Sequence, residues 1–375
     1  MAMIACAFAV PACDQPPLFG PSPNADAGRG PEPSADAHPA NDAAVGGTDA
    51  GSDGGSIPPD YSIVVLPDTQ YYAAAFPDIF MKQASWIVEN REAQQIAFVL
   101  HTGDLVDSDA PAQWTVASNS LHMLDGVIPY VIAAGNHDYG NLADRMGLVN
   151  SYFPPSGFAN YSWFGDTFEA GHIENSFSVI PAGRTRWLVI SLEFGPRDEA
   201  IAWASSVLQG FHDLPAIIIT HAYLYHDNSL YNARGTTTQY FNPHGYVMMG
   251  QTRTTINDGQ EMWQKLILPN VNVKMVFSGH DVNFINGDLP PGTTGQLTSK
   301  RPDGSVVHQI LANYQTCTAA PCDISPQGTT VNGGYGFLRI VRFSPAAGTI
   351  SISTYSPVLD MSLVDLTNQF VLPMN

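Results

Sequence analysis

The chain has 375 residues, with 15 Lys and Arg against 34 Asp and Glu, which gives a formal net charge of -19 at pH 7. This charge repels phosphate backbones and anionic lipid, so it disfavours nucleic-acid binding and attachment to a membrane surface by charge. Hydrophobic residues make up 44% of the chain, yet no apolar run reaches the roughly 18 residues that span a bilayer. We therefore expect a soluble globular protein with a large core.

Residues 1–13 resemble a truncated bacterial lipoprotein signal, in which a short apolar run ends in small residues before Cys13. No Lys or Arg precedes the run, so either the start lies upstream or the segment is only an apolar N-terminus. Residues 14–60 are mostly Pro, Ala, Gly, Asp and Ser, a composition that predicts a disordered linker. The spacing of Cys317 and Cys322 suits a local disulfide, with two reduced thiols as the alternative. These features predict an exported periplasmic or cell-surface lipoprotein that meets a membrane only through its N-terminal lipid anchor.

From Tyr61 onward, short β-rich runs alternate with amphipathic helical patterns. The first half is expected to contain strands over 62–66, 96–101 and 129–134, and helices over 79–93 and 113–124. The second half is expected to contain a hairpin of 176–180 and 186–192, strands over 216–220 and 273–277, and helices over 197–208 and 259–267. Strand-like runs follow over 306–314, 336–343 and 349–354. We predict one α/β domain over 61–375, a monomer, built as a four-layer α-β-β-α sandwich with two packed mixed β-sheets.

Polar clusters follow five of the expected strands. They are Asp68-Thr-Gln70, Gly103-Asp104-Leu-Val-Asp107, Gly135-Asn136-His137-Asp138, Thr220-His221 and Gly279-His280. Because the carboxyl ends of parallel strands meet at one edge of a sheet, we expect these clusters to converge. Carboxylates, imidazoles and an amide together suit divalent metals, and a metal pair can activate water and clamp a phosphoryl group. One such cluster alone is more typical of a turn, but five in order predict a metal site.

The five clusters resemble the calcineurin-like metallophosphoesterase family, whose motifs are D-x-H, G-D-x-x-D, G-N-H-D/E, a single His and G-H-x-H. The resemblance covers about residues 61–357, and G-D-L-V-D and G-N-H-D match fully and in order. The stretches LPDTQYY, LEFGPRDE, THAYLY and HQILANYQ are similar to a secreted bacterial branch whose members are called metallophosphoesterases or serine/threonine-type phosphatases.

The resemblance implies two divalent metal ions between two β-sheets. Asp104 would bridge them, Asn136, His221 and His280 would complete the second site, and Asp68 would serve the first site. The sequence departs from the family at the first site, where Gln70 and Val282 stand in place of two ligand histidines.

Three interpretations of this departure remain open. The Gln70 side-chain oxygen, together with Asp68, Asp104 and Asn283, could make an oxygen-rich first site for Mn or Mg, with Fe or Zn as the other candidates. Alternatively, one tight ion occupies the second site beside a weak, exchangeable one. The third interpretation is a site that binds metal without turnover.

The family pattern also assigns the acid–base residues, whereas the substrate candidates come from their positions in the sequence. His137 matches the general acid, and Asp107 matches the carboxylate that orients it. Arg197 could clamp a phosphate oxygen, while His226 and Asn313 are further candidates for contact with substrate. Asp138 is expected to cap a turn.

The sequence therefore predicts an exported metal-dependent hydrolase of small phosphate esters, in which a bridging hydroxide attacks phosphorus and His137 assists departure of the leaving group. The alternative is a non-catalytic, metal-stabilised surface binding module on the same fold. A hydrolase with a Ser or Cys nucleophile is disfavoured, because no G-x-S-x-G motif is present.

Overall fold

The computed structural model describes residues 59–246, 256–283, 292–315 and 333–374. All of these residues belong to one compact unit, which spans Gly55–Asn375. The predicted lipoprotein signal, nearly all of the predicted linker, and Cys317 and Cys322 lie outside the described residues. No helix within the described ranges is long and apolar enough to cross a membrane.

The first sheet joins the N-terminal strands of the domain to the C-terminal ones. Its strand order is β13-β12-β11-β1-β2-β3, and β14 also pairs with β12. The strands are β1 (Tyr61–Leu66), β2 (Ile96–His101), β3 (Tyr130–Ile132), β11 (Leu338–Ser344), β12 (Thr349–Ser356), β13 (Met361–Leu363) and β14 (Phe370–Pro373). β1, β2 and β3 are parallel, whereas β11 pairs with β1 in antiparallel fashion, so the sheet is mixed.

The second sheet has the order β4-β5-β6-β7-β8-β10-β9. Its strands are β4 (Phe164–Thr167), β5 (Ser176–Ala182), β6 (Thr185–Leu192), β7 (Ala216–Thr220), β8 (Val273–Ser278), β9 (Thr293–Lys300) and β10 (Val306–Asn313). β6, β7, β8 and β10 run parallel. The predicted hairpin is confirmed, since β5 and β6 pair in antiparallel register.

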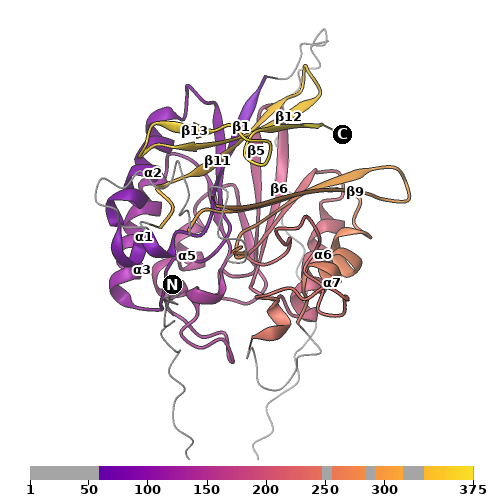
Figure 1. Ribbon diagram of the computed structural model, residues 1–375, viewed down its shortest axis with the longest axis horizontal. Helices are drawn as coiled ribbons and strands as arrows, with labels where there is room; N and C mark the ends of the chain where they lie inside the picture. Colours follow the sequence, from indigo (N-terminus) through magenta and orange to yellow (C-terminus); the bar gives the residue numbers. More distant parts are fainter. Residues whose placement is uncertain (1–58, 247–255, 284–291, 316–332, 375) are drawn as a thin grey trace, which may run out of the picture. The chain divides into compact units, whose positions relative to one another are not determined.

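Helices lie beside each sheet. The α-helices are α1 (Gln70–Ala75), α2 (Pro77–Asn90), α3 (Pro111–Leu121), α4 (Val149–Tyr152), α5 (Pro155–Phe158), α6 (Asp198–Gly210) and α7 (Gly259–Met262). The 3-10 turns are η1 (His122–Leu124), η2 (Asn136–Asp138) and η3 (Pro243–Gly245), and the π-helical turn η4 (Trp263–Ile267) continues α7. Figure 1 shows α1, α2 and α3 on the side of β1, and α6 and α7 on the other side, beyond β6.

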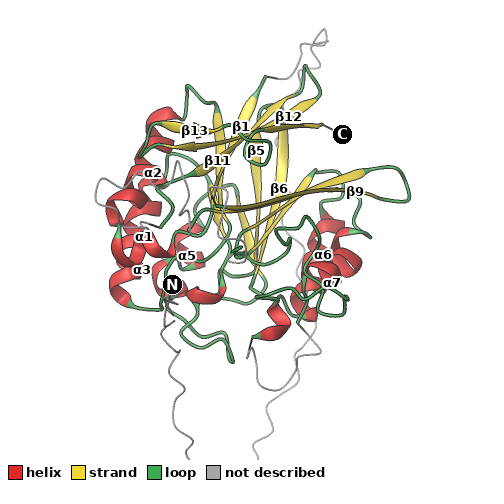
Figure 2. Cartoon of the chain, in the orientation of Figure 1, coloured by secondary structure: helices red, strands yellow, loops and turns green. Residues whose placement is uncertain are grey.

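Three apolar clusters hold these layers together. The central cluster joins the facing sides of the two sheets, with Val65 and Phe98 from the first and Ile217 and Phe277 from the second. A second cluster packs the other face of the first sheet on α2 and α3, and a third packs the second sheet on α6, α7 and η4. The strands in Figure 2 accordingly lie between helices, which confirms the predicted α/β fold with two mixed sheets.

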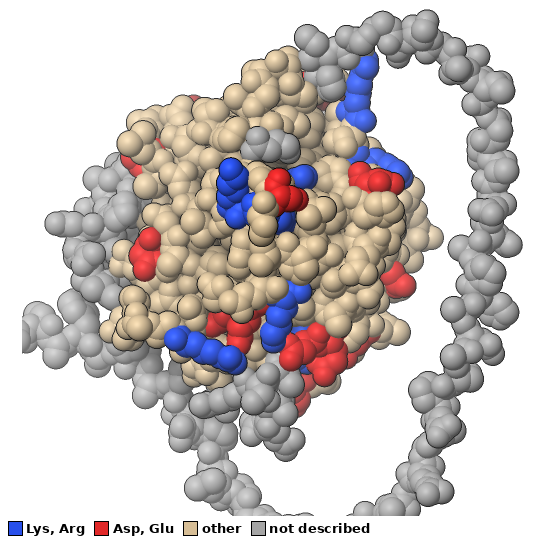
Figure 3. Space-filling view, turned by 90° about the vertical axis from the view of Figure 1, so that its right-hand side faces the viewer, with Lys and Arg blue, Asp and Glu red and all other residues tan. Residues whose placement is uncertain are grey.

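Charged side chains are a minority on the face of the molecule that Figure 3 shows. Figure 3 shows, on the face that it presents, basic and acidic side chains scattered singly or in small groups among uncharged ones. Charged residues are only 13% of the sequence. Burial of apolar faces between sheets and helices, rather than surface ion pairs, is therefore the main favourable term in folding.

Candidate metal centre

The predicted polar clusters lie where parallel strands end. Asp68 follows β1 by two residues, Asp104 follows β2 by three, and Asn136 begins the 3-10 turn after β3. From the second sheet, His221 follows β7 directly and His280 follows β8 by two residues. Both sheets thus contribute to one group of side chains, because His221 Nε2 lies 3.0 Å from Asp104 Oδ2.

The backbone at these strand ends is unusual. Asp68, Asp104 and His280 have positive φ angles of 20°, 52° and 72°, a conformation that costs free energy in residues other than glycine. The neighbouring glycines leave space for carboxylates, because a Cβ atom at Gly135 would collide with Asp104 Oδ1 and one at Gly279 would collide with Asp68 Oδ2. Gly135 and Gly279 are therefore explained by the carboxylates that pack against them, whereas Gly103 has a φ of 103° and packs against the His221 ring.

Asp104 is at the centre of the group. Its Oδ1 accepts the backbone N–H of His137 at 3.0 Å, and its Oδ2 accepts the Gln70 Nε2–H at 3.1 Å. The ring centroids of His221 and His280 are 4.8 Å apart. Asp104, His221 and His280 are buried, and each offers one atom within 4.8 Å of the other two, so they could hold a metal ion.

Several buried polar atoms here have no hydrogen-bond partner among the described residues. They are Asp68 Oδ2, Gln70 Oε1 and Asn136 Oδ1, whereas His221 Nε2 faces Asp104 Oδ2 at 3.0 Å as an ion pair. Burying polar atoms without partners is costly, so native structures normally satisfy them. Carboxylate and amide oxygens and an imidazole nitrogen are metal ligands, and their convergence fits divalent cations.

The shifted pKa values of the centre also indicate a site that suits a cation. Burial raises the pKa of Asp68 to about 8, although His221 acts against this shift. Burial acts to lower the pKa of His221, but the carboxylate of Asp104 outweighs it and raises that pKa to about 9. Burial and His221 lower the pKa of His280 to about 3. The proton on His221 therefore supplies positive charge where a cation would bind, and a bound metal would displace it.

The sequence profile of the calcineurin-like phosphoesterases matches residues 61–284. The chain belongs to this family. It is also 32% identical over 303 residues to the uncharacterized protein YvnB of Bacillus subtilis (strain 168), a match that covers 79% of this chain and 20% of that protein. The chain thus spans about a fifth of the length of the curated relative it matches.

Solved structures similar to this phosphoesterase domain share little sequence with it. The purple acid phosphatase PPD1 from yellow lupin (Lupinus luteus) seeds has a TM-score of 0.45 and 15% identity, over 84% of this chain and 54% of that one. The 5'-nucleotidase precursor from Thermus thermophilus has a TM-score of 0.38 and 10% identity, over 84% of this chain and 54% of that one.

His137 lies at the edge of the phosphoesterase centre, with 40% of its side chain exposed. Its Nδ1 is 2.7 Å from the backbone oxygen of Asp107 and 3.8 Å from the Asp107 carboxylate. Because a carbonyl oxygen only accepts, Nδ1 carries the proton and Nε2 is left for other chemistry. Burial acts to lower the pKa of His137, but Asp104 and the Asp107 carbonyl outweigh it and raise that pKa.

Two residues of the expected first metal site, Gln70 and Asp104, are hydrogen-bonded to each other. Gln70 is the first residue of α1, and its amide nitrogen donates to Asp104 while its oxygen stays without a partner among the described residues. Val282 lines the pocket above the centre and offers no ligand atom. Asn283 donates its backbone N–H to Thr293 Oγ1, and it is not part of the described lining of that pocket.

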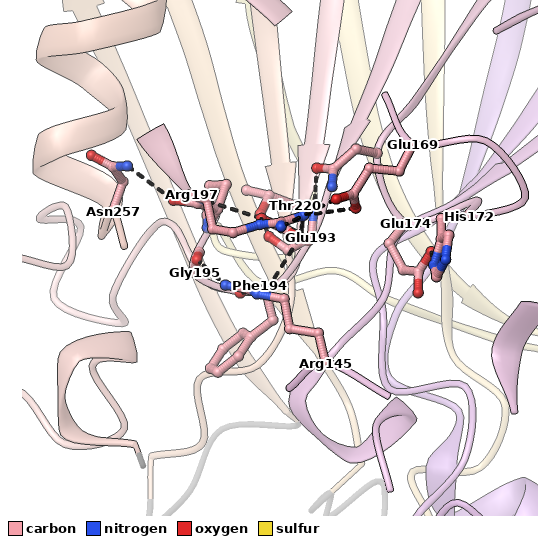
Figure 4. Close-up of polar contacts among 12 residues, drawn as sticks. Arg145, Glu169, His172, Glu174, Glu193, Phe194, Gly195, Arg197, Thr220 and Asn257 are labelled. Carbon is pink, nitrogen blue, oxygen red and sulfur yellow. Dashed lines mark hydrogen bonds and ion pairs between the residues drawn. The ribbon is translucent and has the colours of Figure 1, made fainter. Parts of the chain in front are cut away.

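Arg197 is bound by carboxylates of its own domain. Its guanidinium donates to Glu193 Oε1 at 2.9 Å and to Glu169 Oε2 at 2.8 Å, as Figure 4 shows. Arg145 donates to the backbone oxygens of Phe194 and Gly195, each at 2.7 Å. We call Arg145, Glu169, Glu193 and Arg197 the arginine network. Its two glutamates bind the guanidinium of Arg197, the group that the sequence suggested for binding a phosphate oxygen.

The other two substrate candidates also have protein partners. His226 Nδ1 is 2.7 Å from Oδ2 of Asp281, the residue that directly follows His280 in the sequence. Asn313 is buried, and its Oδ1 accepts the backbone N–H of Gln315 at 2.9 Å while its Nδ2 has no partner in the described part of the chain. Neither His226 nor Asn313 is part of the described pocket lining.

The predicted structural role of Asp138 agrees with its contacts. Its carboxylate accepts the backbone N–H of Gly135 at 2.8 Å and that of Val106 at 3.1 Å. It therefore fixes the loops after β2 and β3 relative to each other.

The prediction missed four pocket residues, which are Tyr71, Phe241, Tyr246 and Gln315. Tyr71 directly follows the Asp68-Thr-Gln70 cluster, so its position next to a motif was the available signal. Phe241 and Tyr246 belong to the long loop between Tyr223 and Asp258, whose length alone is typical of a functional segment.

Proposed function

We propose that the protein is a metal-dependent hydrolase of phosphate esters. The observation that carries this proposal is the set of buried ligand atoms that both sheets direct to Asp104, three of them without described partners, beneath a pocket of about 130 Å³. Family membership supports the same chemistry.

The ligand atoms divide into two groups around Asp104. Asn136, His221 and His280 would hold the second ion with Asp104, and Asp68 and Gln70 would hold the first. Divalent ions supply polarisation of phosphoryl oxygens and activation of the attacking water. The oxygen-rich first group favours Mn or Mg, with Fe or Zn as the alternatives. We infer weaker binding there, because Gln70 is a neutral amide and Val282 contributes no donor.

His137 would then act on the leaving group. Its Nδ1–H bond to the Asp107 carbonyl fixes the ring, so Nε2 can carry a proton toward the pocket. The raised pKa gives His137 a larger protonated fraction than an ordinary histidine has at the same pH. The Asp107 carboxylate, at 3.8 Å, adds electrostatic support for the imidazolium.

Hydrolysis of chromogenic phosphomonoesters and phosphodiesters, with and without Mn, tests this proposal. We expect Mn-dependent turnover in at least one ester class, and its loss in the Asp104→Asn variant. Elemental analysis after Mn loading should find two ions per chain at high Mn, with one retained on dialysis. Turnover in neither class by a protein that binds Mn would favour the metal-stabilised binding module instead.

We also propose, from the sequence before Asp14 alone, that the enzyme is exported and anchored through a lipid on Cys13. Membrane fractionation of the full-length natural protein should place it with the membrane. A Cys13→Ser variant that stays equally membrane-bound would contradict the anchor.

A further inference from the structure

A buried histidine that is not among the proposed ligands lies three residues before Asp104 in the sequence. His101 is the last residue of β2 and is almost completely buried. It is not part of the described lining of the pocket. A buried imidazole needs partners for both ring nitrogens, because an unpaired polar atom away from water costs free energy.

Both ring nitrogens of His101 have partners on loops that carry proposed metal ligands. Nδ1 lies 3.2 Å from the backbone nitrogen of Gly103, and Nε2 lies 2.9 Å from Thr69 Oγ1. A backbone N–H only donates, so Nδ1 is the acceptor. Burial lowers the pKa of His101 to about 3, and the charge of His221 adds to this shift, so the ring is neutral. Its one proton is therefore on Nε2, which donates to Thr69.

The hydroxyl of Thr69 continues this chain of hydrogen bonds. It accepts the Nε2–H of His101 and donates in turn to the backbone oxygen of Leu105, at the longer distance of 3.4 Å. Every group in the chain thus has the donor or the acceptor that its partner requires. We call the side chains of Thr69 and His101 the histidine–threonine pair.

The position of Thr69 before a helix makes these bonds informative. Thr69 directly precedes α1, where a threonine hydroxyl usually accepts a backbone N–H of the first helical turn. Among the described contacts, its side chain makes no such capping bond and is bound to His101 and Leu105 instead. The hydroxyl therefore stabilises the contact between two loops rather than the helix.

The histidine–threonine pair joins the two loops that supply the proposed first metal site. Thr69 stands between Asp68 and Gln70, and the two backbone groups that the pair binds flank Asp104 on both sides. Asp68 and Asp104 have positive φ angles, so contacts from elsewhere must hold their backbone in place. The pair is thus placed to fix the distance between the first-site ligands of one loop and that of the other.

The histidines of the proposed second site are held in another way. His221 Nδ1 is 2.8 Å from the backbone oxygen of Thr102. His280 Nε2 is 2.8 Å from the backbone oxygen of Phe241. Since a carbonyl oxygen only accepts, each ring donates from that nitrogen and has its other nitrogen for a cation. The described hydrogen bonds of the Thr69 side chain involve neither histidine, so loss of its hydroxyl should act mainly on the first site.

We propose that Thr69 and His101 are positioning residues that set the geometry of the first metal site and thereby its affinity for a divalent cation such as Mn. This inference rests on the metal centre of the function proposed above, and it assigns two residues that act on that centre through its ligands.

Mn binding tests the inference without relying on turnover. Thr69→Val keeps the shape of the side chain and removes the hydroxyl, and it should weaken the lower-affinity Mn site at least about tenfold. The higher-affinity site should change by less than about threefold. Calorimetric titration measures both affinities. An unchanged lower-affinity site, equal weakening of both sites, or fewer than two Mn ions bound by the wild-type protein would overturn the inference.

Two matched variants separate positioning from a general loss of stability. Thr69→Ser retains the hydroxyl and should bind Mn within about threefold of wild type at both sites. Thr354→Val removes another buried hydroxyl, in β12, which is bonded to Tyr314 and Asn368, and it should leave both Mn affinities unchanged. Weak binding in Thr69→Ser, or equal weakening in Thr354→Val, would contradict a positioning role.

A variant of His101 tests the pair from its other side. Asn in place of His101 can still accept the Gly103 N–H but is too short to reach Thr69, so His101→Asn should also weaken the lower-affinity site at least about tenfold. The double variant with Thr69→Val should weaken it no further than either single variant, because each alone breaks the same hydrogen bond. Fully additive weakening would show that the two residues act separately.

Hydrolysis of the chromogenic esters keeps this inference distinct from the proposal on which it rests. Mn-dependent turnover by the wild-type protein, with Mn affinities that Thr69→Val does not change, would refute the positioning role and leave the phosphoesterase proposal standing. Two Mn sites that differ between wild type and Thr69→Val as expected, without hydrolysis of any ester, would refute the activity and leave the positioning role in place.

Discussion

The metal centre and the arginine network are two charged regions, each with a buried carboxylate at its centre, that differ in how their carboxylates are paired. In the network, burial acts to raise the pKa of Glu193, but Arg145 and Arg197 outweigh it and lower that pKa. In the metal centre, burial raises the pKa of Asp68 to about 8, and its Oδ2 has no partner within the described residues. The network has two guanidinium groups for its carboxylates, whereas in the centre one histidine, His221, faces both Asp68 and Asp104, an arrangement that suits added cations.

The two regions are also physically connected. Arg145 holds the carbonyls of Phe194 and Gly195, and the Phe194 ring centroid lies 5.0 Å from that of His280 and 5.8 Å from that of His221. The network thus fixes the strand end whose aromatic ring packs against two metal ligands. We therefore expect changes in the network to affect mainly stability and changes in the centre to affect mainly metal affinity and turnover.

The largest effect is expected at Asp104. The Asp104→Asn variant removes one negative charge from the residue that both groups of ligands share, and it should lower Mn affinity at least about 100-fold. Calorimetric titration of Mn measures this directly. Asp107→Asn is the matched control and should retain wild-type Mn affinity, because Asp107 contacts His137 rather than the ligands. Wild-type affinity in the Asp104→Asn variant would place the metal elsewhere.

Arg145→Met should chiefly affect stability. It leaves the buried Glu193 with one guanidinium fewer and two backbone carbonyls without donors, so we expect a loss of about 3 kcal/mol in the free energy of unfolding. Urea denaturation measures the loss. Arg186 is exposed, and the control Arg186→Met should change the free energy of unfolding by less than about 0.5 kcal/mol. The increase in melting temperature on adding Mn should persist in both variants; its loss in Arg145→Met alone would show that the network also sets metal affinity.

His137→Ala should lower kcat about tenfold to 100-fold and leave Mn affinity unchanged, because the side chain carries a proton and is not among the proposed ligands. Steady-state kinetics and Mn titration on the same preparation check both statements. The exposed His172→Ala is the control, with wild-type values expected for both. Unchanged turnover in the His137→Ala variant would remove His137 from the mechanism.

The strand ends were predictable because the strands themselves are buried apolar runs. β2 and β7 have the predicted bounds, and β1 and β8 differ by one residue. The edge strand β9 (TTGQLTSK) was not predicted: it pairs only with β10 within the described sheet, so its exposed residues need not be apolar. The helix predicted from residue 79 begins at Pro77, whose fixed φ suits the first turn.

The candidate site was predictable where a residue follows a strand directly. The sequence indicates that Asp104 and His221 each follow a strand, but the two strands belong to different sheets, and the side chains meet because those sheets pack face to face. The partners of Arg197 were not predictable, since Glu169 lies 28 residues earlier in the chain and its position depends on tertiary packing. The aromatic pocket wall was missed for the same reason, since Phe241 and Tyr246 come from a loop without a periodic pattern.

The smallest effect is expected in the pH dependence of the metal-free protein. The pKa of Asp68 in the folded state is about 8, above its ordinary value of 3.8. Folding therefore favours the protonated carboxyl, so its contribution to stability is present below about pH 4 and lost as pH rises through 8. His221, with its pKa raised to about 9, contributes in the same direction.

The free energy of unfolding of chelator-treated protein should thus fall by at least about 1 kcal/mol between pH 5 and 8.5, relative to the Asp68→Asn variant. Urea denaturation at each pH measures this loss. Mn should suppress this difference in the wild-type protein, because a cation stabilises the ionised carboxylate; an equal loss with Mn bound would mean that Asp68 is not a ligand.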